Sequence, residues 1–334
     1  MSENRQMMIA AIPTDALKSS DFELRSGPIP TPGDGEILAR TLALTIGAGQ
    51  RAGLQGSASY AGAAQADTVM TGTGIARVEA SHSPDFAVGD LVVGRTDWQD
   101  YSVLQSRGLT KVAKDGDPAL HLGTLGTNGL TAYFGLLEVG GAKEGETVVV
   151  SAAAGSVGHM VGQIAKLKGC DVVGVAGSDA KCETLVKELG FDRAVNYKDP
   201  DFRAAFKAAT PNRIDVYFDN TGGDILGSAL FRMNAHGRIV CCSAVSQYDT
   251  SSPSGSPRGI PGLLVNNRVR MEGFLVFDFA ARYEDARREL RAWIESGQLV
   301  PRVTEFDGLE KAGEAFVELL GGGTIGTTLV RVAE

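Results

Sequence analysis

The sequence contains few cysteines and histidines, the residues that form disulfides and bind zinc. Among its 334 residues there are four cysteines and four histidines, at Cys170, Cys182, Cys241, Cys242, His82, His121, His159 and His236. The cysteines are too few and too irregularly spaced for a disulfide framework or a CxxC zinc ribbon. The histidines lack the i, i+4 spacing and the nearby cysteines of a zinc site, so we expect them at the surface or in loops. The sequence therefore predicts no metal site.

Long apolar runs and basic runs are absent as well. No stretch is apolar for long enough to span a bilayer, and the polar residues 1–8 do not resemble a signal peptide. The formal net charge of −8 disfavours nucleic acid and anionic membranes as partners. Hydrolase chemistry is disfavoured because Ser156, between Gly155 and Val157, does not lie in a G-x-S-x-G elbow. We interpret the chain as a soluble, cytoplasmic protein.

The first third of the chain predicts a β-rich domain. Short apolar and β-branched runs occur at 36–44, 73–79, 91–94 and 98–104, and turn sequences rich in Pro, Gly and Asp separate them. The segment 48–66 consists mainly of Gly, Ala, Ser and Gln without a clear period, so we expect an irregular loop there. The length of 334 residues suits two domains rather than one.

From about residue 122 the pattern changes to alternating strands and helices, which indicates a parallel sheet covered by helices. The expected strands are 147–150, 171–176, 193–196, 214–218, 237–243 and 271–277, and the expected helices include 157–167, 181–189, 201–208, 223–233 and 282–296. Cys241 and Cys242 should point to opposite faces of the fifth strand. The irregular loop 244–261 follows that strand, and a loop of this length is usually functional. A strand at 327–332 could return to the first domain.

The stretch after the first of these strands matches a dinucleotide-binding fingerprint. Ala153, Gly155, Ser156, Val157 and Gly158 lie between the strand and a helix, with alanine in the first position of G-x-G-x-x-G. A helix amino terminus offers free N–H groups to a pyrophosphate, and glycine lets the backbone approach it closely. The strand that follows completes the strand–helix–strand unit that the fingerprint requires. The structural alternative is a small-residue turn that packs a helix onto a sheet.

The end of the second strand indicates which dinucleotide binds. An NAD site has an acid there for the ribose 2′-hydroxyl, whereas this strand ends in Gly177 and Ser178. Asp179 opens the next helix, where an acid is expected as a cap. Lys181, in the first turn of that helix, could reach a 2′-phosphate, or it could be a solvated surface residue. The missing acid favours NADPH.

Several motifs together resemble a known family. They are 130–136 (LTAYFGL), 152–158 (AAAGSVG), 163–166 (QIAK), 176–181 (AGSDAK), 217–220 (YFDN) with Gly222 and Gly223, 270–274 (RMEGF) and 85–90 (DFAVGD). In this order they resemble the zinc-independent medium-chain dehydrogenase/reductases. Within that family they are most similar to NADPH-dependent alkene reductases of the prostaglandin reductase and curcumin reductase type, and the resemblance covers nearly the whole chain.

The resemblance implies a fold, an assembly and site residues. Residues 1–123, completed by 301–334, would form a GroES-like substrate domain, and residues 124–300 a doubly wound α/β (Rossmann) domain, with the active site between them and two copies in a homodimer. Lys181 would hold the 2′-phosphate. The other implied cofactor contacts are Tyr197, Asn220, Cys242, Tyr248, Phe274, Leu275 and Val276. Each implied role has a structural alternative: Tyr197 could end a strand, 274–276 could be core, and Tyr248 could anchor a loop.

The sequence also departs from the family's pattern. Many relatives have Asp-Pro-Tyr-Met-Arg where this chain has residues 47–51 (GAGQR), which keep only Arg51. A second substrate-side tyrosine of the mammalian reductases aligns with Asn266. Near the C-terminus Thr324 and Thr327 replace an Asn and a Lys. These changes leave cofactor use in place, while the substrate and the proton donor are open.

The expected reaction is hydride transfer from NADPH to the β-carbon of an α,β-unsaturated ketone or aldehyde, followed by protonation of the enolate. The protein has to orient the cofactor and stabilise charge on the carbonyl oxygen, with Tyr248 and Asn266 as candidate catalytic donors. Alternatives of the same fold are a quinone reductase and an allylic or secondary alcohol dehydrogenase. The alternative from another class is a non-catalytic NADPH-binding protein, which the changed segment 47–51 favours.

Overall fold

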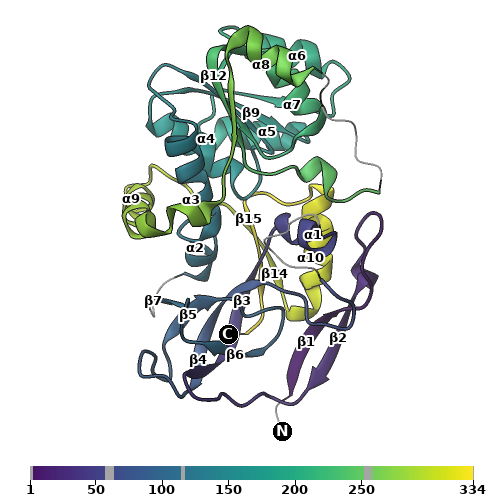
Figure 1. Ribbon diagram of the computed structural model, residues 1–334, viewed down its shortest axis with the longest axis vertical. Coiled ribbons are helices and arrows are strands. Elements are labelled where there is room, and N and C mark those ends of the chain that lie inside the picture. Colours follow the sequence, from purple (N-terminus) through teal and green to yellow (C-terminus); the bar gives the residue numbers. More distant parts are fainter. Residues whose placement is uncertain (1–2, 57–63, 114–116, 252–256, 258, 334) are drawn as a thin grey trace. The chain divides into compact units, whose positions relative to one another are not determined.

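The computed structural model describes residues 3–56, 64–113, 117–251, 257 and 259–333. The chain forms two compact units (Figure 1). The first consists of Met1–Gly126, Asp249–Ser251 and Val303–Glu334, and the second of Thr127–Tyr248 and Ser252–Arg302. The first unit is therefore assembled from three separate parts of the sequence.

The first unit is built on a sheet to which both ends of the chain contribute. In sheet order its strands are β14 (Val303–Asp307), β15 (Thr327–Arg331), β3 (Glu36–Ile46), β4 (Thr73–Ser81), β5 (Leu91–Gly94) and β7 (Thr110–Val112), and β6 (Tyr101–Gln105) also pairs with β3. The C-terminal β15 runs antiparallel to β3, with Thr328 opposite Ile46. A separate hairpin, β1 (Asn4–Ile9) with β2 (Phe22–Gly27), was not foreseen from the sequence.

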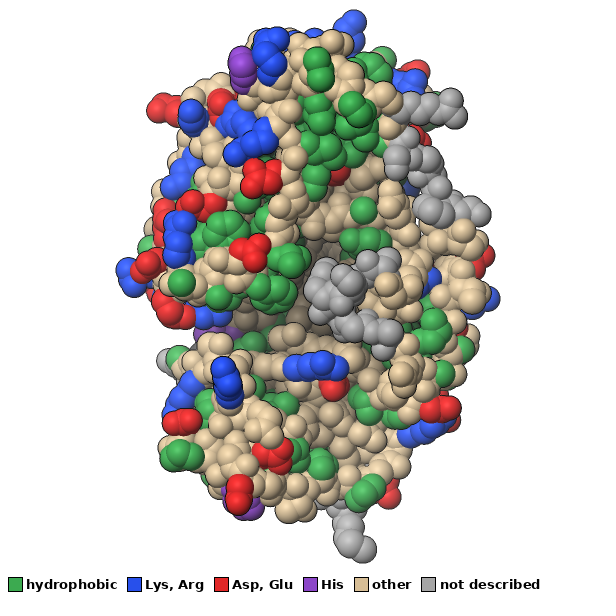
Figure 2. All heavy atoms as spheres, in the orientation of Figure 1, with side chains coloured by type: hydrophobic (Ala, Val, Ile, Leu, Met, Phe, Trp, Pro, Cys, Tyr) green, Lys and Arg blue, Asp and Glu red, His purple; other side chains and the backbone are tan. Residues whose placement is uncertain are grey.

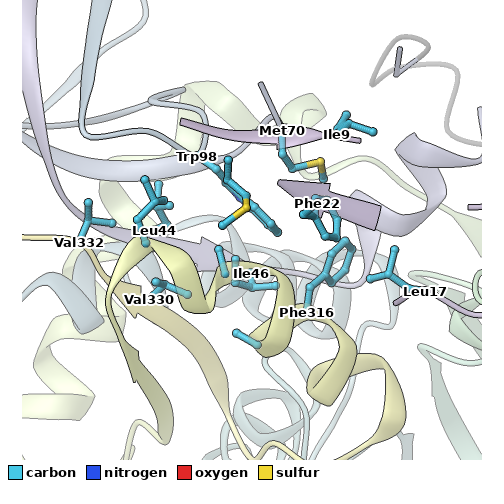
Figure 3. Close-up of a cluster of buried hydrophobic side chains, with 14 of the residues drawn as sticks. Ile9, Leu17, Phe22, Leu44, Ile46, Met70, Trp98, Phe316, Val330 and Val332 are labelled. Carbon is cyan, nitrogen blue, oxygen red and sulfur yellow. The ribbon is translucent and has the colours of Figure 1, made fainter. Parts of the chain in front are cut away.

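The core of the first unit is a cluster of aromatic and aliphatic side chains (Figure 3). The rings of Phe22, Trp98 and Phe316 pack against one another with centroids 5.3 to 6.3 Å apart. Phe316 comes from α10 (Ala312–Gly321), so the C-terminal helix and the N-terminal hairpin share this core. Such aromatic pairs add to the free energy gained from burial alone.

The expected irregular loop at 48–66 is partly wrong. Residues Gly49–Leu54 form helix α1, and residues 57–63 lie outside the described part of the chain. Glycine-rich sequence gives α1 little helix propensity, but Ala52, Leu54 and the whole side chain of Arg51 are buried, so tertiary packing stabilises the turn. A further short helix, α2 (Pro118–Leu122), begins at an Asp117 cap whose side chain accepts the N–H of Ala119.

The second unit confirms the predicted α/β fold. Its six strands are all parallel, in the order β10 (Arg193–Asn196), β9 (Asp171–Ala176), β8 (Thr147–Ser151), β11 (Ile214–Asp219), β12 (Met233–Cys241) and β13 (Arg270–Gly273). Numbered along the chain this is 3-2-1-4-5-6, the order of a doubly wound dinucleotide-binding sheet. The central β8 is buried over its whole length, which explains its uninterrupted Thr-Val-Val-Val-Ser sequence.

Helices connect the strands of the second unit. They are α3 (Thr127–Phe134), continued by a π-helical turn at Gly135–Val139, then α4 (Gly158–Leu167), α5 (Asp179–Lys187), α6 (Phe202–Ala209), α7 (Gly223–Leu230), α8 (Ile260–Asn267) and α9 (Tyr283–Glu295). On one face of the sheet, Val149, Tyr217 and Ile239 form a core with side chains of α6, α7 and α8. Hydrophobic side chains also remain exposed over α7 and α8 (Figure 2), including Val265.

Three details of the predicted second unit are wrong. Helix α7 ends at Leu230 rather than Met233, because Met233 is buried and begins β12. Strand β12 ends at Cys241, so Cys242 lies beyond the strand rather than on its opposite face. Strand β13 ends at Gly273, and Val276–Arg282 form a 3₁₀ helix in place of the expected strand end. None of the helices in the described residues is long and apolar enough to cross a bilayer.

Candidate active site

Most of the predicted cofactor residues lie at one edge of the second unit's sheet. All six strands are parallel, so the residues that follow them meet at the carboxyl edge, where ligands bind in such folds. The residues that follow a strand in this way are Ala153, Gly155, Ser156, Val157 and Gly158 after β8, Gly177, Ser178 and Lys181 after β9, Tyr197 after β10, Asn220 after β11, Cys242 and Tyr248 after β12, and Phe274 after β13.

The turn after β8 is tightly folded. Ala152 has a φ of 46°, unusual for a residue other than glycine, and its carbonyl accepts the N–H of Gly155 at 2.9 Å. A Cβ on Gly158 would collide with that same carbonyl oxygen and come within 2.8 Å of the Ala153 Cα. Only glycine therefore lets α4 begin so close to the end of β8. Gly158 therefore serves the packing of the helix onto the strand, which both the fingerprint and its structural alternative require.

A buried histidine supports this turn, which corrects the expectation of a surface or loop position. His159, the second residue of α4, has no exposed surface, and its Nδ1 lies 2.8 Å from the carbonyl oxygen of Gly155. The N–H of Arg302 donates to His159 Nε2 at 3.2 Å, so Nδ1 carries the proton and donates to Gly155. Burial lowers the pKa of His159 to about 4, which keeps the ring neutral. The sequence feature that could have predicted this buried position is that His159 directly follows Gly158 of the glycine turn.

The end of β9 combines a close backbone approach with a cation. The ring of Tyr197 lies against Gly177, where a Cβ would be 3.1 Å from the ring. Ser178 caps α5 by accepting the N–H of Lys181 at 3.3 Å. Lys181 is half-buried, and burial followed by repulsion from Lys198 lowers its pKa. An anion bound beside Lys181 would compensate for both effects.

The carboxylate nearest to this position in sequence is engaged elsewhere. Asp179 follows Ser178 directly, and its Oδ1 accepts the side-chain N–H of Asn196 at 3.0 Å. It opens α5, as predicted, in the first turn where an acid interacts favourably with the helix dipole. The carboxylate that would accept from a ribose 2′-hydroxyl is thus not supplied by the tip of β9.

Asn220 ties three strand ends together. Its backbone N–H donates to Ser151 Oγ at 2.9 Å, its side-chain amide donates to the Ser151 carbonyl at 2.8 Å, and its own carbonyl accepts from Ser243 Oγ at 2.6 Å. The side chain is buried in these contacts. Asn220 therefore holds the ends of β8 and β11, and the residue that follows β12 by two positions, in fixed positions.

Asp219 is a residue at this edge that the sequence analysis did not select. It is buried, and its Oδ1 accepts hydrogen bonds from Tyr217 at 3.1 Å and from the N–H groups of Thr221 and Gly222 at 3.1 and 2.8 Å. Burial raises its pKa, although these donors act in the opposite direction. The carboxylate fixes the turn at Gly222, whose φ is 69°. The sequence feature that could have identified Asp219 is an acidic residue directly at the end of an apolar strand.

Cys242 and Tyr248 belong to the segment that leaves β12. Burial raises the pKa of the Cys242 thiol to about 12, so it stays protonated and is not a nucleophile. Tyr248 follows a 3₁₀ turn at Val245–Gln247, and its hydroxyl oxygen accepts the N–H of Ala244 at 3.2 Å. The half-buried ring is thereby held by its own loop. Residues 252–256 and 258 of the predicted loop 244–261 lie outside the described residues.

The three residues after β13 differ in their surroundings. Phe274 packs beside the π-helical turn, where a Cβ on Gly135 would lie 2.7 Å from its ring, and its centroid is 6.4 Å from that of Phe279. Leu275 is 42% exposed, whereas Val276 is buried and starts the 3₁₀ helix. The segment leaves the strand because the Leu275 carbonyl accepts the N–H of Asp278 at 3.0 Å instead of continuing the ladder.

The structure does not bring Asn266 to this edge. Asn266 is exposed near the end of α8, and its carbonyl accepts from Arg268 Nη1 at 3.2 Å. Arg268 also contacts His236, near the start of β12. Asn266 therefore lies at the amino ends of the strands within the second unit, on the side opposite to Gly158 and Tyr248.

Histidine, cysteine and acidic side chains do not gather into a metal-binding cluster in the described part of the chain: no group of three or more could hold an ion. The four cysteines are free thiols.

Comparisons with known proteins agree with this architecture. Residues 5–112 match the family model described as the N-terminal domain of oxidoreductase, and residues 156–293 match the model described as zinc-binding dehydrogenase. The chain is similar to the NADPH-dependent curcumin reductase of Escherichia coli, with 38% identity covering 99% of this chain and 97% of that protein. It is also similar to the NADP(+)-dependent 2-alkenal reductase of Nicotiana tabacum, with 38% identity covering 99% of this chain and 98% of that protein.

A solved structure extends the similarity to three dimensions. CurA from Vibrio vulnificus in complex with NADPH has a TM-score of 0.94 and 37% identity to this chain, covering 99% of both chains. The order of strands, the glycine turn and the full-length similarity lead to one conclusion. The chain belongs to the medium-chain dehydrogenase/reductases, in the branch of NADPH-dependent oxidoreductases that includes the curcumin and prostaglandin reductases.

Proposed function

We propose that this protein uses NADPH to reduce the carbon–carbon double bond of α,β-unsaturated ketones and aldehydes. The observation that carries the proposal is the pairing, at one sheet edge, of the glycine turn before α4 with Lys181 in the first turn of α5. Relatives of similar length and about 38% identity are named for curcumin and for 2-alkenals, both of which contain a double bond conjugated to a carbonyl.

The residues present fit a dinucleotide phosphate. The turn 152–158 leaves no room for a Cβ at Gly158, so α4 begins directly after the turn at the carboxyl edge of the sheet, where the amino terminus of a helix favours a phosphate. Lys181 offers a cation where a 2′-phosphate would need one, and Asp179 is held by Asn196. In this proposal 153–158 hold the pyrophosphate, Gly177 and Ser178 approach the ribose, and Lys181 and Tyr197 contact the 2′-phosphate.

The remaining predicted residues act on the nicotinamide side in this proposal. Phe274, Leu275 and Val276 come after β13, and Asn220 and Cys242 come after β11 and β12, so all follow strands on the same side of β8. Asn220 acts by fixing the strand ends, as its contacts with Ser151 indicate. Tyr248 is the candidate donor to the carbonyl oxygen of the substrate.

When bound, NADPH would supply a hydride to the β-carbon of the substrate, which leaves negative charge on the carbonyl oxygen. The task of the protein's own residues is to present a hydrogen-bond donor to that oxygen and to exclude water. A single well-aimed donor lowers the activation barrier by roughly 3 kcal/mol. A proton then has to reach the α-carbon, from a side chain or from water.

The reaction can be tested with cofactor deuterated at the transferable position of nicotinamide C4. We expect an enone and an enal to be reduced, with deuterium at the β-carbon, and solvent deuterium at the α-carbon when the reaction is run in D₂O. Reduction of a quinone alone would favour the quinone reductase alternative. With NADP+ and an allylic alcohol deuterated at its carbinol carbon, transfer of that deuterium to nicotinamide C4 would indicate an alcohol dehydrogenase. Tight NADPH binding without turnover on any acceptor would indicate a non-catalytic binding protein.

The proposal includes a homodimer. Strand β13 is the edge of the parallel sheet, pairs only with β12 among the described strands, and is followed by the exposed Leu275 and Phe277. An open edge with apolar neighbours is a natural site for strand pairing between two copies related by a two-fold axis. Sedimentation equilibrium should give twice the chain mass, and a Phe277→Asp variant, which places a charge beside this edge, should shift it towards the monomer.

A further inference from the structure

Two lysines follow neighbouring strands of the second unit. Lys181 lies in the first turn of α5, beyond β9, and Lys198 comes two residues after the end of β10. The two strands pair in parallel, with Asn196 opposite Ala176, so both lysines lie at the same edge. Tyr197 connects them: its ring lies against Gly177, and Lys198 Nζ is 6.0 Å from the ring centroid.

Lys198 is held from its backbone while its charge is left for other partners. Asn196 donates from its side-chain amide to Asp179 at 3.0 Å and accepts the backbone N–H of Lys198 with its side-chain oxygen at 3.0 Å. This chain of bonds fixes the start of Lys198 beside α5. Within the residues that the structure describes, no carboxylate forms an ion pair with the Lys198 ammonium.

The two ammonium groups are close enough to repel. Burial and then the charge of Lys198 lower the pKa of Lys181, so keeping both groups charged is unfavourable in the free protein. A phosphate monoester carries about two negative charges near neutral pH and accepts several charge-assisted hydrogen bonds. Such a group beside Lys181 would turn the repulsion between the lysines into a shared attraction.

We propose that Lys198 is a second cationic contact for the 2′-phosphate of NADPH, and that Lys181 and Lys198 together set the preference for NADPH over NADH. This inference rests on the proposed function, in which Lys181 is the first such contact. It assigns Lys198 a role that the fingerprint and the family resemblance did not suggest. The role of Tyr197 is then to pack against Gly177 and to place its ring beside the ammonium of Lys198.

The test measures the binding of four ligands to the full chain by isothermal titration calorimetry: NADPH, NADH, adenosine 2′,5′-bisphosphate and adenosine 5′-monophosphate. Lys198→Met removes the charge and keeps an unbranched side chain of similar length, whereas Lys198→Arg keeps the charge. Lys207→Met, on the exposed last turn of α6, changes the net charge by the same amount and is the matched control. Lys181→Ala is the reference for the first contact.

We expect Lys198→Met to weaken the binding of NADPH and of the 2′,5′-bisphosphate by about tenfold, and to change the other two ligands by less than about twofold. Lys198→Arg should stay within about twofold of the unchanged protein, and Lys207→Met should have no effect. Lys181→Ala should weaken NADPH binding by about tenfold or more.

Equal losses of NADPH and NADH in Lys198→Met would overturn the inference, since they would show that Lys198 supports the fold rather than the phosphate. NADPH binding unchanged in Lys198→Met, but weakened in Lys181→Ala, would also overturn it and leave the proposed cofactor in place. Equal binding of NADPH and NADH by the unchanged protein would instead contradict the proposed function.

Discussion

The guanidinium of Arg51 donates from Nε to Oδ1 of Asp249 at 2.9 Å. The side chain of Arg51 has no exposed surface, and the same Asp249 oxygen accepts the N–H of Leu17 at 2.7 Å. Asp249 directly follows Tyr248, which is the last residue of that part of the second unit, and its half-buried carboxylate pairs with a buried arginine of the first unit. Arg51, in segment 47–51, thus has a structural partner in this chain.

We expect Asp249→Ala to destabilise the first unit. The substitution leaves the buried guanidinium with the Asp15 carbonyl but without a carboxylate, and an incompletely paired buried group of this kind costs about 1 to 3 kcal/mol. Asp249→Asn should cost less, because its amide oxygen can still accept from Leu17 and Arg51. The chain has two tryptophans, so urea unfolding in a Trp293→Phe background reports on the first unit through Trp98.

The control for this prediction is Glu314→Ala, which removes an exposed pair with Lys311 in the same unit. Exposed pairs contribute little, so its unfolding midpoint should match that of the background protein. If Asp249→Ala unfolds at the same urea concentration as Glu314→Ala, the Arg51–Asp249 ion pair does not contribute to the free energy of unfolding.

Tyr248→Phe tests the proposed donor to the carbonyl oxygen. If Tyr248 stabilises the charge that develops there, the variant should lower kcat by an amount near one hydrogen bond, roughly 1–3 kcal/mol, with a smaller change in NADPH affinity. The hydroxyl oxygen also accepts the N–H of Ala244, so a purely structural role would appear as a changed stability with kcat retained. Steady-state kinetics on one enone and a thermal unfolding curve distinguish the two.

Asn266→Ala is the comparison variant for this measurement. The aligned position suggested a second donor, but Asn266 lies at the amino ends of the strands with its carbonyl bound by Arg268. We therefore expect an unchanged kcat, and a double variant no worse than Tyr248→Phe alone. A non-additive loss in the double variant would restore Asn266 to the site.

The parts of the fold that the sequence predicts are those encoded by neighbouring residues. The β8–turn–α4–β9 unit has a buried apolar strand, a small-residue turn and an amphipathic helix in succession, and each signal is local. Helix α1 has no such signal, because its Gly and Gln residues are stabilised by burial of Arg51 rather than by periodicity. The hairpin of β1 and β2 likewise depends on packing against Trp98 and Phe316.

The same limit applies to the candidate site. Lys181 and the glycines after β8 can be selected from spacing alone, since the fold places strand ends together. The Arg51–Asp249 pair joins residues 198 positions apart, and the contact of His159 with Arg302 joins residues 143 apart. Sequence pattern contains no information on such contacts. The prediction that Asn266 lies in the site was wrong for a related reason. A position matched by sequence does not show at which end of the strands the helix that carries it will end.

Activity should be indifferent to metal removal. The histidines and cysteines do not cluster in the described residues, and the proposed hydride transfer needs no Lewis acid. Prolonged dialysis against a chelator should leave the rate of enone reduction unchanged, with a zinc-dependent alcohol dehydrogenase treated in parallel as the control. A loss of rate that added zinc restores would contradict the proposed chemistry.

The buried His159 predicts a specific pH dependence. Its neutral ring donates to Gly155 and accepts from Arg302, and burial lowers its pKa from about 6.5 to about 4. The unfolded chain therefore binds a proton between these values that the folded chain does not. Its contribution to stability is complete above pH 6.5 and is lost as the pH falls towards 4, by at most about 1.4 kcal/mol per pH unit. Between pH 7 and 5 this histidine alone should lower the free energy of unfolding by about 2 kcal/mol.

In NMR spectra, the ring resonance that disappears in His159→Gln should not shift between pH 8 and 5, whereas free histidine in the same buffer titrates over that range. A resonance that moves with a midpoint near 6.5 would show a solvated ring, and the support of the glycine turn by His159 would then be wrong.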